Sequence, residues 1–255
     1  MSKYLVFGRK LKSCQVWFEN FHAVDIGDYV VFHGVEKVEQ KRNIVDIGMQ
    51  KSLITDLSRD ECDIFSDFSS TVKNEIRRSE RENVRCEVIT SGNILKNDLF
   101  IKEFPAMYSG MYQQKGLDRS LNISELAAYA EKGDFVLSVA YIGDSPVVFH
   151  SYICNGENSR LLHSCSEFRS EDKNIRNLIG RENKYLHWKD MQYLKGLGVK
   201  YYDWGGIHSY SAPNGIDKFK ISFGGSQYEY YNVTVARTFK AKMMFAIKKL
   251  LKNES

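Results

Sequence analysis

The sequence is poor in proline, in long apolar runs and in secretion signals. It has only three prolines among 255 residues, and no low-complexity segment interrupts it, so we expect no disordered linker. No apolar run approaches the roughly 18 to 20 residues that a membrane-spanning helix needs. Near the N-terminus, Gly8, Arg9 and Lys10 come too early for a secretory signal. These absences predict a cytoplasmic protein without a membrane span.

Paired cysteines are also missing. The five cysteines form no CxxC motif, and their number is odd. They are Cys14, Cys62, Cys86, Cys154 and Cys165. Scattered cysteines without metal-ligand spacing are typical of reduced thiols that serve as small apolar residues. The sequence therefore predicts no metal site.

An excess of charge of one sign is absent as well. The formal net charge is +4, which suits an anionic small molecule as well as tRNA and leaves the class of partner open. The length of 255 residues allows one large domain or two small ones.

What the sequence does contain is an alternation of strand and helix patterns. The first half predicts short strands, a longer strand over 44–57, a helix capped by Ser58 and an amphipathic helix over 67–84. The second half predicts a hairpin, a strand, a helix, two more strands and a basic helix over residues 135–154, 159–168, 182–197, 199–204, 227–235 and 237–252. This order is typical of an α/β protein with a mixed sheet.

Four stretches resemble the FemAB-like branch of the GNAT acyltransferase superfamily in order and spacing. They are the Arg-rich helix "STVKNEIRRSERENV" (70–84), the hairpin "AYIGDSPVVFHSYI" (140–153), the segment "IGRENKYLHWKDMQYLKGLGVKYYDWGGI" (179–207) and the closing motif "GIDKFKISFGG" (215–225). The resemblance covers most of residues 44 to 232. It implies a GNAT fold over residues 121–255, preceded by a truncated GNAT-like half over residues 1–120. It also implies an N-acyltransferase that uses coenzyme A as the acyl carrier.

The segment "RNLIGREN" (176–183) is the predicted donor site. A helix that begins after Gly180 would present unpaired N–H groups to a pyrophosphate, and arginines beside it could pair with the phosphates. The residues assigned to the cofactor are Arg176, Asn177, Gly180, Arg181 and Asn183. An ordinary loop before an ordinary helix is the alternative. The second glycine of the usual acetyltransferase loop is also missing, so a donor other than free acyl-CoA stays open.

The predicted catalytic residues are Asp203 and His163. Asp203 ends a strand beside Gly205 and Gly206, and His163 lies on a neighbouring predicted strand, so together they could orient and deprotonate an acceptor amine. His150 lies on the strand next to that of His163 and is assigned to the substrate. The alternative for both histidines is a hydrogen-bonded core position.

Further residues are assigned to the acceptor. Arg77 and Arg78, on the cationic side of the helix over 67–84, are expected to reach phosphates, unless that side is only a solvated face. Tyr210 lies in a loop that could cover the acceptor, and Lys218 and Lys220 could stabilise a phosphate or a developing oxyanion.

The FemAB-like peptidyltransferases that the sequence resembles are much longer and often carry a helical arm for tRNA, so a smaller acceptor is expected. The preferred hypothesis is acyl transfer from acyl-CoA to the amino group of a nucleotide-linked amino deoxysugar, in surface polysaccharide biosynthesis. A tRNA-dependent aminoacyl or peptidyl transferase is the nearest alternative. A non-catalytic binding module and a nucleic-acid-binding protein also stay open.

Overall fold

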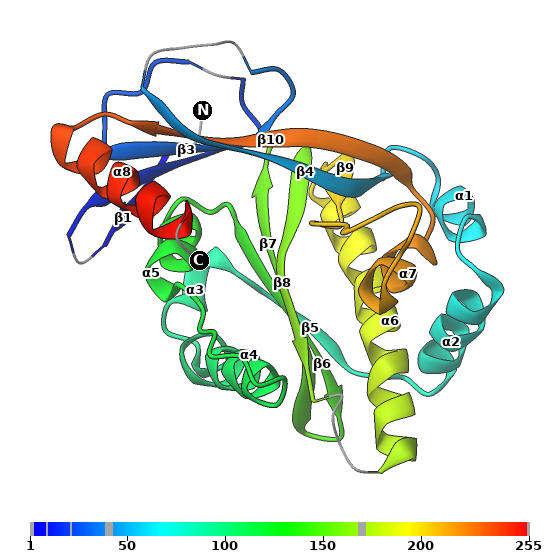
Figure 1. The fold of residues 1–255 in the computed structure, drawn as a ribbon. Coiled ribbons are helices and arrows are strands. Elements are labelled where there is room, and N and C mark those ends of the chain that lie inside the picture. The colour runs from blue at the N-terminus through cyan, green and yellow to red at the C-terminus, as the bar shows by residue number, and fades with distance from the viewer. Residues whose placement is uncertain (1–2, 9, 21, 39–42, 168–171, 254–255) are drawn as a thin grey trace.

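Strands from both halves of the chain form one mixed sheet. The computed structural model describes residues 3–8, 10–20, 22–38, 43–167 and 172–253. The strands are β1 (Lys3–Phe7), β2 (Lys12–Trp17), β3 (Tyr29–Val35), β4 (Ile44–Asp56), β5 (Cys86–Thr90), β6 (Phe135–Ile142), β7 (Ser145–Asn155), β8 (Asn158–Ser166), β9 (Tyr201–Asp203) and β10 (Ser226–Ala236). Their order in the ten-stranded sheet is β1-β2-β3-β10-β4-β9-β8-β7-β6-β5 (Figure 1). The predicted mixed α/β sheet is confirmed.

Helices cover both sides of the sheet. They are α1 (Glu61–Ser66), α2 (Ser70–Arg81), α3 (Ser91–Ile94), the π-helical turn η1 (Leu99–Glu103), α4 (Phe104–Gln113), α5 (Ile123–Glu131), α6 (Lys173–Gly196), α7 (Gly215–Ile221) and α8 (Phe239–Asn253). Figure 1 shows α2, α6 and α7 on one side of strands β6 to β8, and α4 and α5 on the other. Each side has its own apolar cluster, so the sheet is buried on both faces there.

The last strand joins the two halves of the chain. β10 lies between β3 and β4 and pairs antiparallel with both, while β2 and β3 pair in parallel. C-terminal residues therefore complete the N-terminal part of the sheet. The division into a half over 1–120 and a domain over 121–255 stays a prediction.

The amphipathic helix predicted over 67–84 forms as α2. Its buried side includes Val72 and Ile76, and the Ser69 side chain accepts a hydrogen bond from the Val72 amide as the N-cap. The predicted cap at Ser58 is wrong. The Ser58 hydroxyl donates to Asp56 at 2.6 Å, and the helix that follows begins after Asp60 instead. Ser58 thus closes a turn with Asp56, two residues earlier, and its hydroxyl is used there and not as a helix cap.

Candidate active site

Strands β8 and β9 diverge after three residue pairs. The parallel ladder runs from Asn158 paired with Tyr201 to Arg160 paired with Asp203, although β8 continues to Ser166. Beyond Asp203 the chain bonds to β4, where the amide of Trp204 donates to the carbonyl of Leu53 at 3.0 Å. Beyond Arg160, no ladder joins β8 to the segment that follows β9 in the described residues, and we call this unpaired stretch the gap.

Gly205 fixes the geometry at the start of this gap. Its φ is +69°, and a Cβ at this position would lie 2.8 Å from the carbonyl oxygen of Leu161 on β8. A side chain would meet backbone there, in a conformation that L residues rarely adopt. Glycine is required at this position because the two backbones come so close.

Asp203 lies buried beside the gap, at the end of β9. Its carboxylate accepts hydrogen bonds from the Ser52 hydroxyl and, at 2.8 Å, from the Gly205 amide. Nη1 of Arg160 lies 3.2 Å from the second carboxylate oxygen. Both oxygens of Asp203 are therefore held in place, as a positioned catalytic or binding carboxylate would need.

Arg160 is a buried cation that sequence reasoning missed. Its guanidinium lies 4.8 Å from the ring centroid of Tyr230 and 5.7 Å from that of Trp17. The imidazole of His33 stacks on Trp17 with a centroid distance of 4.0 Å, and burial lowers the pKa of His33 to about 3, so this ring stays neutral. Burial also lowers the pKa of Arg160, while Asp203 raises it. The aromatic rings and the carboxylate together stabilise the positive charge.

Lys220 approaches the same place from α7. Its Nζ donates to the carbonyl of Gly206 at 2.9 Å and would lie 3.9 Å from a Cβ at Gly205. Burial lowers the pKa of Lys220 to about 8, against the attraction of Asp203. The structure thus brings two of the predicted residues, Asp203 and Lys220, to one site, and adds Arg160 to them.

A cavity of about 570 Å³ opens on the Asp203 side of the sheet. Carboxylates from three further residues line it, namely Glu19, Glu36 and Asp56. Its other lining residues are Phe18, Asn20, Gly34, Ile54, Asn158, Ser159, Tyr201, Ser226, Gln227, Tyr228 and Tyr230. No lysine or arginine is among the described residues that line it. Acidic and aromatic walls of this kind suit a cationic group such as an alkylammonium.

Tyr230 also lines this cavity. The residue is 1% exposed, and its buried Oη has no hydrogen-bond partner among the described residues. A buried hydroxyl without a partner costs stability.

The loop before α7 is anchored to the sheet. The hydroxyl of Tyr210 lies 2.7 Å from the carbonyl oxygen of Ser52 on β4 and 3.0 Å from that of Tyr228 on β10. Asn214 and Asp217 form a capping box that begins α7. Lys218 lies exposed on that helix, away from the Asp203 cluster. Tyr210 therefore holds the loop in place, and its predicted contact with a substrate stays a prediction.

The structure does not bring His163 together with Asp203. His163 accepts or donates a hydrogen bond at 3.1 Å with Ser151 and packs edge-on against Tyr108 of α4. No hydrogen bond joins His163 to Asp203 in the described part of the chain. Burial lowers the pKa of His163 to about 4, which makes it a weak base at neutral pH. Its catalytic role stays a prediction that this geometry does not favour.

The predicted shared cleft for His150 and His163 is wrong. The β7–β8 ladder pairs Ser151 with His163, and His150 precedes Ser151, so the two histidines lie on opposite faces of the sheet. Leu162 is an extra residue in this ladder, because Tyr152 pairs with Leu161. This bulge lies beyond the pairs His150–Ser164 and Ser151–His163, so the ordinary register of the two strands, and not the bulge, places the histidines on opposite faces.

His150 belongs to a sealed polar network between β7 and α6. Its Nδ1 lies 2.7 Å from Asp190, and its Nε2 lies 2.8 Å from Oδ1 of Asn183. The Tyr152 hydroxyl also donates to Asp190, at 2.6 Å, and His187 joins the network through Tyr202 at 2.8 Å. The hydrogen bonds to Asp190 all use its Oδ2, whereas its Oδ1 is buried without a partner among the described residues. A buried hydrogen-bonded network of this kind is expected to stabilise the core.

The predicted start of the donor helix is wrong. α6 begins at Lys173, with Asp172 as N-cap, so Gly180 lies inside the helix and cannot offer an unpaired N–H group. The apolar spacing of Ile175 and Ile179 continues the helix through this glycine. Arg176 and Asn177 lie near its first turn, whereas the loop that precedes Asp172 (residues 168–171) lies outside the described residues.

Arg181 is paired within the protein. Its guanidinium bonds to Glu82 of α2 and lies 2.7 Å from the buried carboxylate of Glu182. Its side chain is only 6% exposed, so its charge is used to join α2 to α6. A pyrophosphate would have to displace both carboxylates to bind it.

Arg77 and Arg78 lie on α2, which packs against α6 (Figure 1). Tyr201 and Asp203 line the acidic cavity, whereas Tyr202 between them packs on the α6 side, so α2 lies on the side of the sheet opposite the cavity. Arg77 lies 5.4 Å from the ring centroid of Phe65, and Nε of Arg78 lies 2.8 Å from Glu82 in an exposed ion pair. Both contacts are typical of a solvated helix face, and neither arginine lines the acidic cavity.

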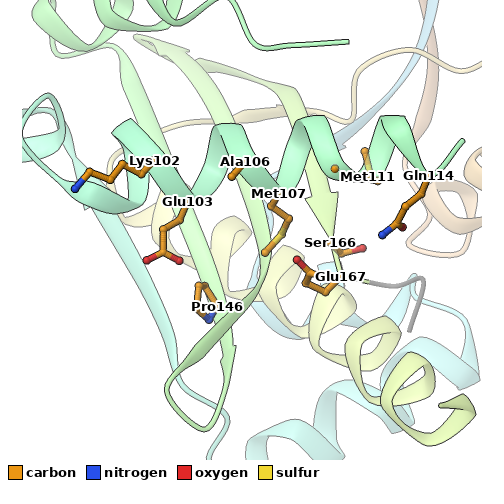
Figure 2. A pocket seen from close by; sticks show the side chains of 10 residues that line it. Lys102, Glu103, Ala106, Met107, Met111, Gln114, Pro146, Ser166 and Glu167 are labelled. Carbon is orange, nitrogen blue, oxygen red and sulfur yellow. The ribbon is translucent and has the colours of Figure 1, made fainter. Parts of the chain in front are cut away.

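A second cavity of about 440 Å³ lies beside α4. Figure 2 shows Met107 of α4 and Gln114 at its end directed toward Ser166 and Glu167 at the end of β8, with Pro146 of β7 on the same side of the helix, below Glu103. It contains none of the residues predicted for catalysis or binding.

A signal for Arg160 was present in the sequence, but none for Ser52. Arg160 is a single cation in the strand "SRLLHSCSEF", whereas Ser52 follows the polar residues Gln50 and Lys51 and does not stand out. A charge at a buried strand position needs a partner. Its partner could not be identified, because the sheet register alone brings β4, β8 and β9 together.

Comparisons with known proteins give the fold. No family model matches the sequence, and no curated protein matches it. Among solved structures, FemX is similar with a TM-score of 0.55 and 13% identity, over 72% of this chain and 61% of FemX. The C-terminal domain of a putative lysylphosphatidylglycerol synthetase from Agrobacterium fabrum has a TM-score of 0.55 and 12% identity, over 98% of this chain and 89% of that domain.

The chain thus spans less than two thirds of FemX, and the acyl donor and acceptor do not follow from the comparison. Among the described helices, none has the length and apolar composition to cross a membrane. What the likeness establishes is that this chain shares the mixed α/β fold of FemX, as the resemblance in its sequence predicted.

Proposed function

We propose that the chain is an acyltransferase that joins an activated acyl group to an amine where β8 and β9 diverge. The observation that carries this proposal is the buried cluster of Asp203, Arg160 and Lys220 beside an acidic cavity. The fold shared with FemX and with a synthetase domain supports a transferase in general.

The geometry suggests how the step would proceed. An acceptor enters the cavity as an ammonium, which the carboxylates attract, and must lose one proton, to Asp203 or to water, before it attacks. Its nitrogen then bonds to the acyl carbon in the gap, and the bond from that carbon to the thiol or hydroxyl leaving group breaks. Lys220 and Arg160 supply positive charge beside the gap, where the oxyanion develops. The leaving group takes up a proton.

Acyl-CoA remains our proposed donor. The unpaired N–H groups of α6 lie near Lys173, at the end of this 24-residue helix that is far from β9, so we do not assign the pyrophosphate to the start of α6. Arg181 is occupied by two carboxylates and is not proposed to bind it either.

The amino group of a nucleotide-linked amino deoxysugar remains our proposed acceptor. The acidic lining suits its ammonium, and the four aromatic residues of the lining offer surfaces for the sugar or base. Its phosphates would need cations from outside the described lining.

A tRNA-dependent aminoacyl transfer is the second candidate. An aminoacyl ester carries its own α-ammonium, which the same acidic lining would attract. In that reaction the cavity would hold the donor rather than the acceptor.

The test is an assay for amide formation with two donors, acetyl-CoA and an aminoacyl-tRNA, and an amine acceptor. We expect a new amide, detected by mass spectrometry, with acetyl-CoA. Neutralising the lining in Glu36→Gln/Asp56→Asn should raise KM for the acceptor by about tenfold, because two charges near the ammonium are lost, with little change in kcat. The exposed pair Asp118→Asn/Asp144→Asn is the matched control.

Each result has one interpretation. An amide formed only from aminoacyl-tRNA selects the second candidate. No amide with either donor rejects a transferase function. An unchanged KM in Glu36→Gln/Asp56→Asn shows that the amine binds outside this cavity.

A further inference from the structure

Helix α8 has an apolar side that the described protein does not cover. Phe239, Met243, Ile247, Leu250 and Leu251 are each between 49% and 77% exposed. Scattered exposed apolar residues are common, but these five lie in one helix of fifteen residues. They form what we call the outer stripe.

The outer stripe faces away from the sheet. The opposite side of α8 is the one that packs, where Ala241 is fully buried and Phe245 contacts the ring of Tyr29 at a centroid distance of 5.3 Å. With roughly 3.6 residues per turn, Phe239, Met243 and Leu250 fall on the side opposite Ala241. Both sides of this helix are therefore apolar, and only one of them has a partner.

Two lysines lie on one flank of the outer stripe. They are Lys242 and Lys249, and both are exposed. Lys240 falls between Ile247 and Leu251 around the helix axis, and its Nζ donates to the carbonyl of Lys10 at 2.7 Å. α8 has five lysines and no acidic residue, so the positive charge of this helix exceeds the net charge of +4 of the whole sequence. The rest of the chain is therefore slightly acidic, and positive charge is concentrated on this helix.

We infer that α8 binds the surface of a lipid bilayer that contains anionic phospholipids. An apolar stripe flanked by lysines is the arrangement of a helix that lies in the membrane interface, with its apolar side chains among the acyl chains and its lysines at the headgroups. The charge complementarity selects anionic lipid. The exposed apolar side chains favour a bilayer over RNA, because a polyanion without apolar surface would leave them in water.

The experiment is flotation of the full chain with vesicles. One set contains equal parts of phosphatidylcholine and phosphatidylglycerol, and the other contains phosphatidylcholine alone. We expect the chain to float with the anionic vesicles and much less with the neutral ones. Ile247→Asp/Leu250→Asp should lower the vesicle-bound to free ratio at least tenfold, and Lys242→Glu/Lys249→Glu should lower it similarly, because each removes one of the two attractions.

Leu117→Asp, a change of another exposed leucine in a loop, is the matched control and should bind like the unchanged chain. Circular dichroism and thermal unfolding establish that each variant is folded, since the changed side chains are exposed.

Three results would overturn the inference. The first is no binding of the unchanged chain to anionic vesicles. The second is binding that survives Ile247→Asp/Leu250→Asp and is lost only in Lys242→Glu/Lys249→Glu, which indicates a purely electrostatic surface such as one for RNA. The third is a dimer in analytical ultracentrifugation that only Ile247→Asp/Leu250→Asp dissociates, because a second copy would then cover the outer stripe.

Discussion

Strands β7 to β9 carry a polar cluster on each face of the sheet, and the two clusters differ in what surrounds them. On the α6 side, Asp190 accepts hydrogen bonds from His150 and Tyr152 inside the core. On the other side, Asp203 and Arg160 form an ion pair next to a cavity of about 570 Å³. Both clusters contain a buried carboxylate beside a cationic or titratable partner.

The two clusters differ in whether a substrate can reach the carboxylate. A substrate cannot reach Asp190 without unfolding α6 from the sheet, whereas Asp203 lines an open cavity. Buried polar networks and catalytic sites both show shifted pKa values, so the shifts alone do not distinguish them. The first cluster should therefore determine stability and the second should determine turnover.

The largest effect is expected from Asp190→Ala. It removes the acceptor of His150 and Tyr152 in a dry interior, so two buried donors lose their partner. We expect a loss of about 3 to 5 kcal/mol in the free energy of unfolding, measured by urea denaturation. Turnover per folded molecule should stay unchanged.

Asp144→Ala is the control for this variant, because Asp144 is fully exposed and lies 3.6 Å from Arg85 in a surface ion pair. It should cost less than about 1 kcal/mol. An Asp190→Ala protein as stable as the unchanged chain would show that the sealed network is not structural.

Asp203→Asn should affect turnover more than stability. The amide keeps the shape and the contact with the Gly205 amide but loses the charge that faces Arg160. We expect kcat to fall about tenfold or more, on the low side of what a positioned acid–base group contributes. His163→Asn is the comparison, because His163 lies apart from this cluster and should change kcat little.

Steady-state kinetics between roughly pH 6 and 9 would measure both variants, a range near the pKa values that acid–base catalysis requires. Near-normal turnover in both would mean that the proton leaves through water. A larger loss in His163→Asn than in Asp203→Asn would restore the role first predicted for the histidine.

Lys220→Arg tests the role of the Lys220 charge through the pH dependence of kcat/KM. Lys220 has a pKa of about 8 in the folded protein, so its positive charge disappears as the pH rises through that value. If this charge stabilises the oxyanion, kcat/KM should fall above about pH 8, and Lys220→Arg, which stays charged, should lack this fall. If kcat/KM falls with the same midpoint pH in the unchanged protein and in Lys220→Arg, another group causes the fall.

Unfolding cannot explain that fall. The folded pKa of Lys220 is below the ordinary value of 10.5, so the unfolded chain binds more protons between about pH 8 and 10.5. The contribution of Lys220 to stability therefore rises with pH in this window, opposite to the expected activity. Circular dichroism across the same range checks that the fold persists.

Local patterns in the sequence predicted much of the fold. The apolar spacing of Val72 and Ile76 predicted α2, and the turn at Gly143 predicted the β6–β7 hairpin. The start of α6 was placed too late, because Gly180 was taken as the end of a loop. A glycine inside a helix costs only about 1 kcal/mol, and the packing of a long helix outweighs that cost.

The candidate site was predictable only in part. Asp203 and the glycines after it mark a strand end, which local sequence shows. Ser52 and Arg160 reach Asp203 from strands far apart in the sequence, and nothing local specifies that register. The register of β7 with β8 likewise pairs Ser151, and not His150, with His163, so the two histidines lie on opposite faces, which strand alternation within each strand does not specify.

The smallest effect is expected from Arg78→Lys on the far side of the sheet. Arg78 forms an exposed pair with Glu82 within one helix, and lysine can replace it there at little cost. Because α2 lies on the side of the sheet opposite the acidic cavity, KM for the amine acceptor should change by less than about twofold. A larger change is expected only if a guanidinium of α2 binds a phosphate of the acceptor. Arg77→Lys should behave in the same way. A several-fold rise of KM in either variant would extend the acceptor site to α2, as the sequence first suggested, and would place a phosphate of the acceptor beside that helix.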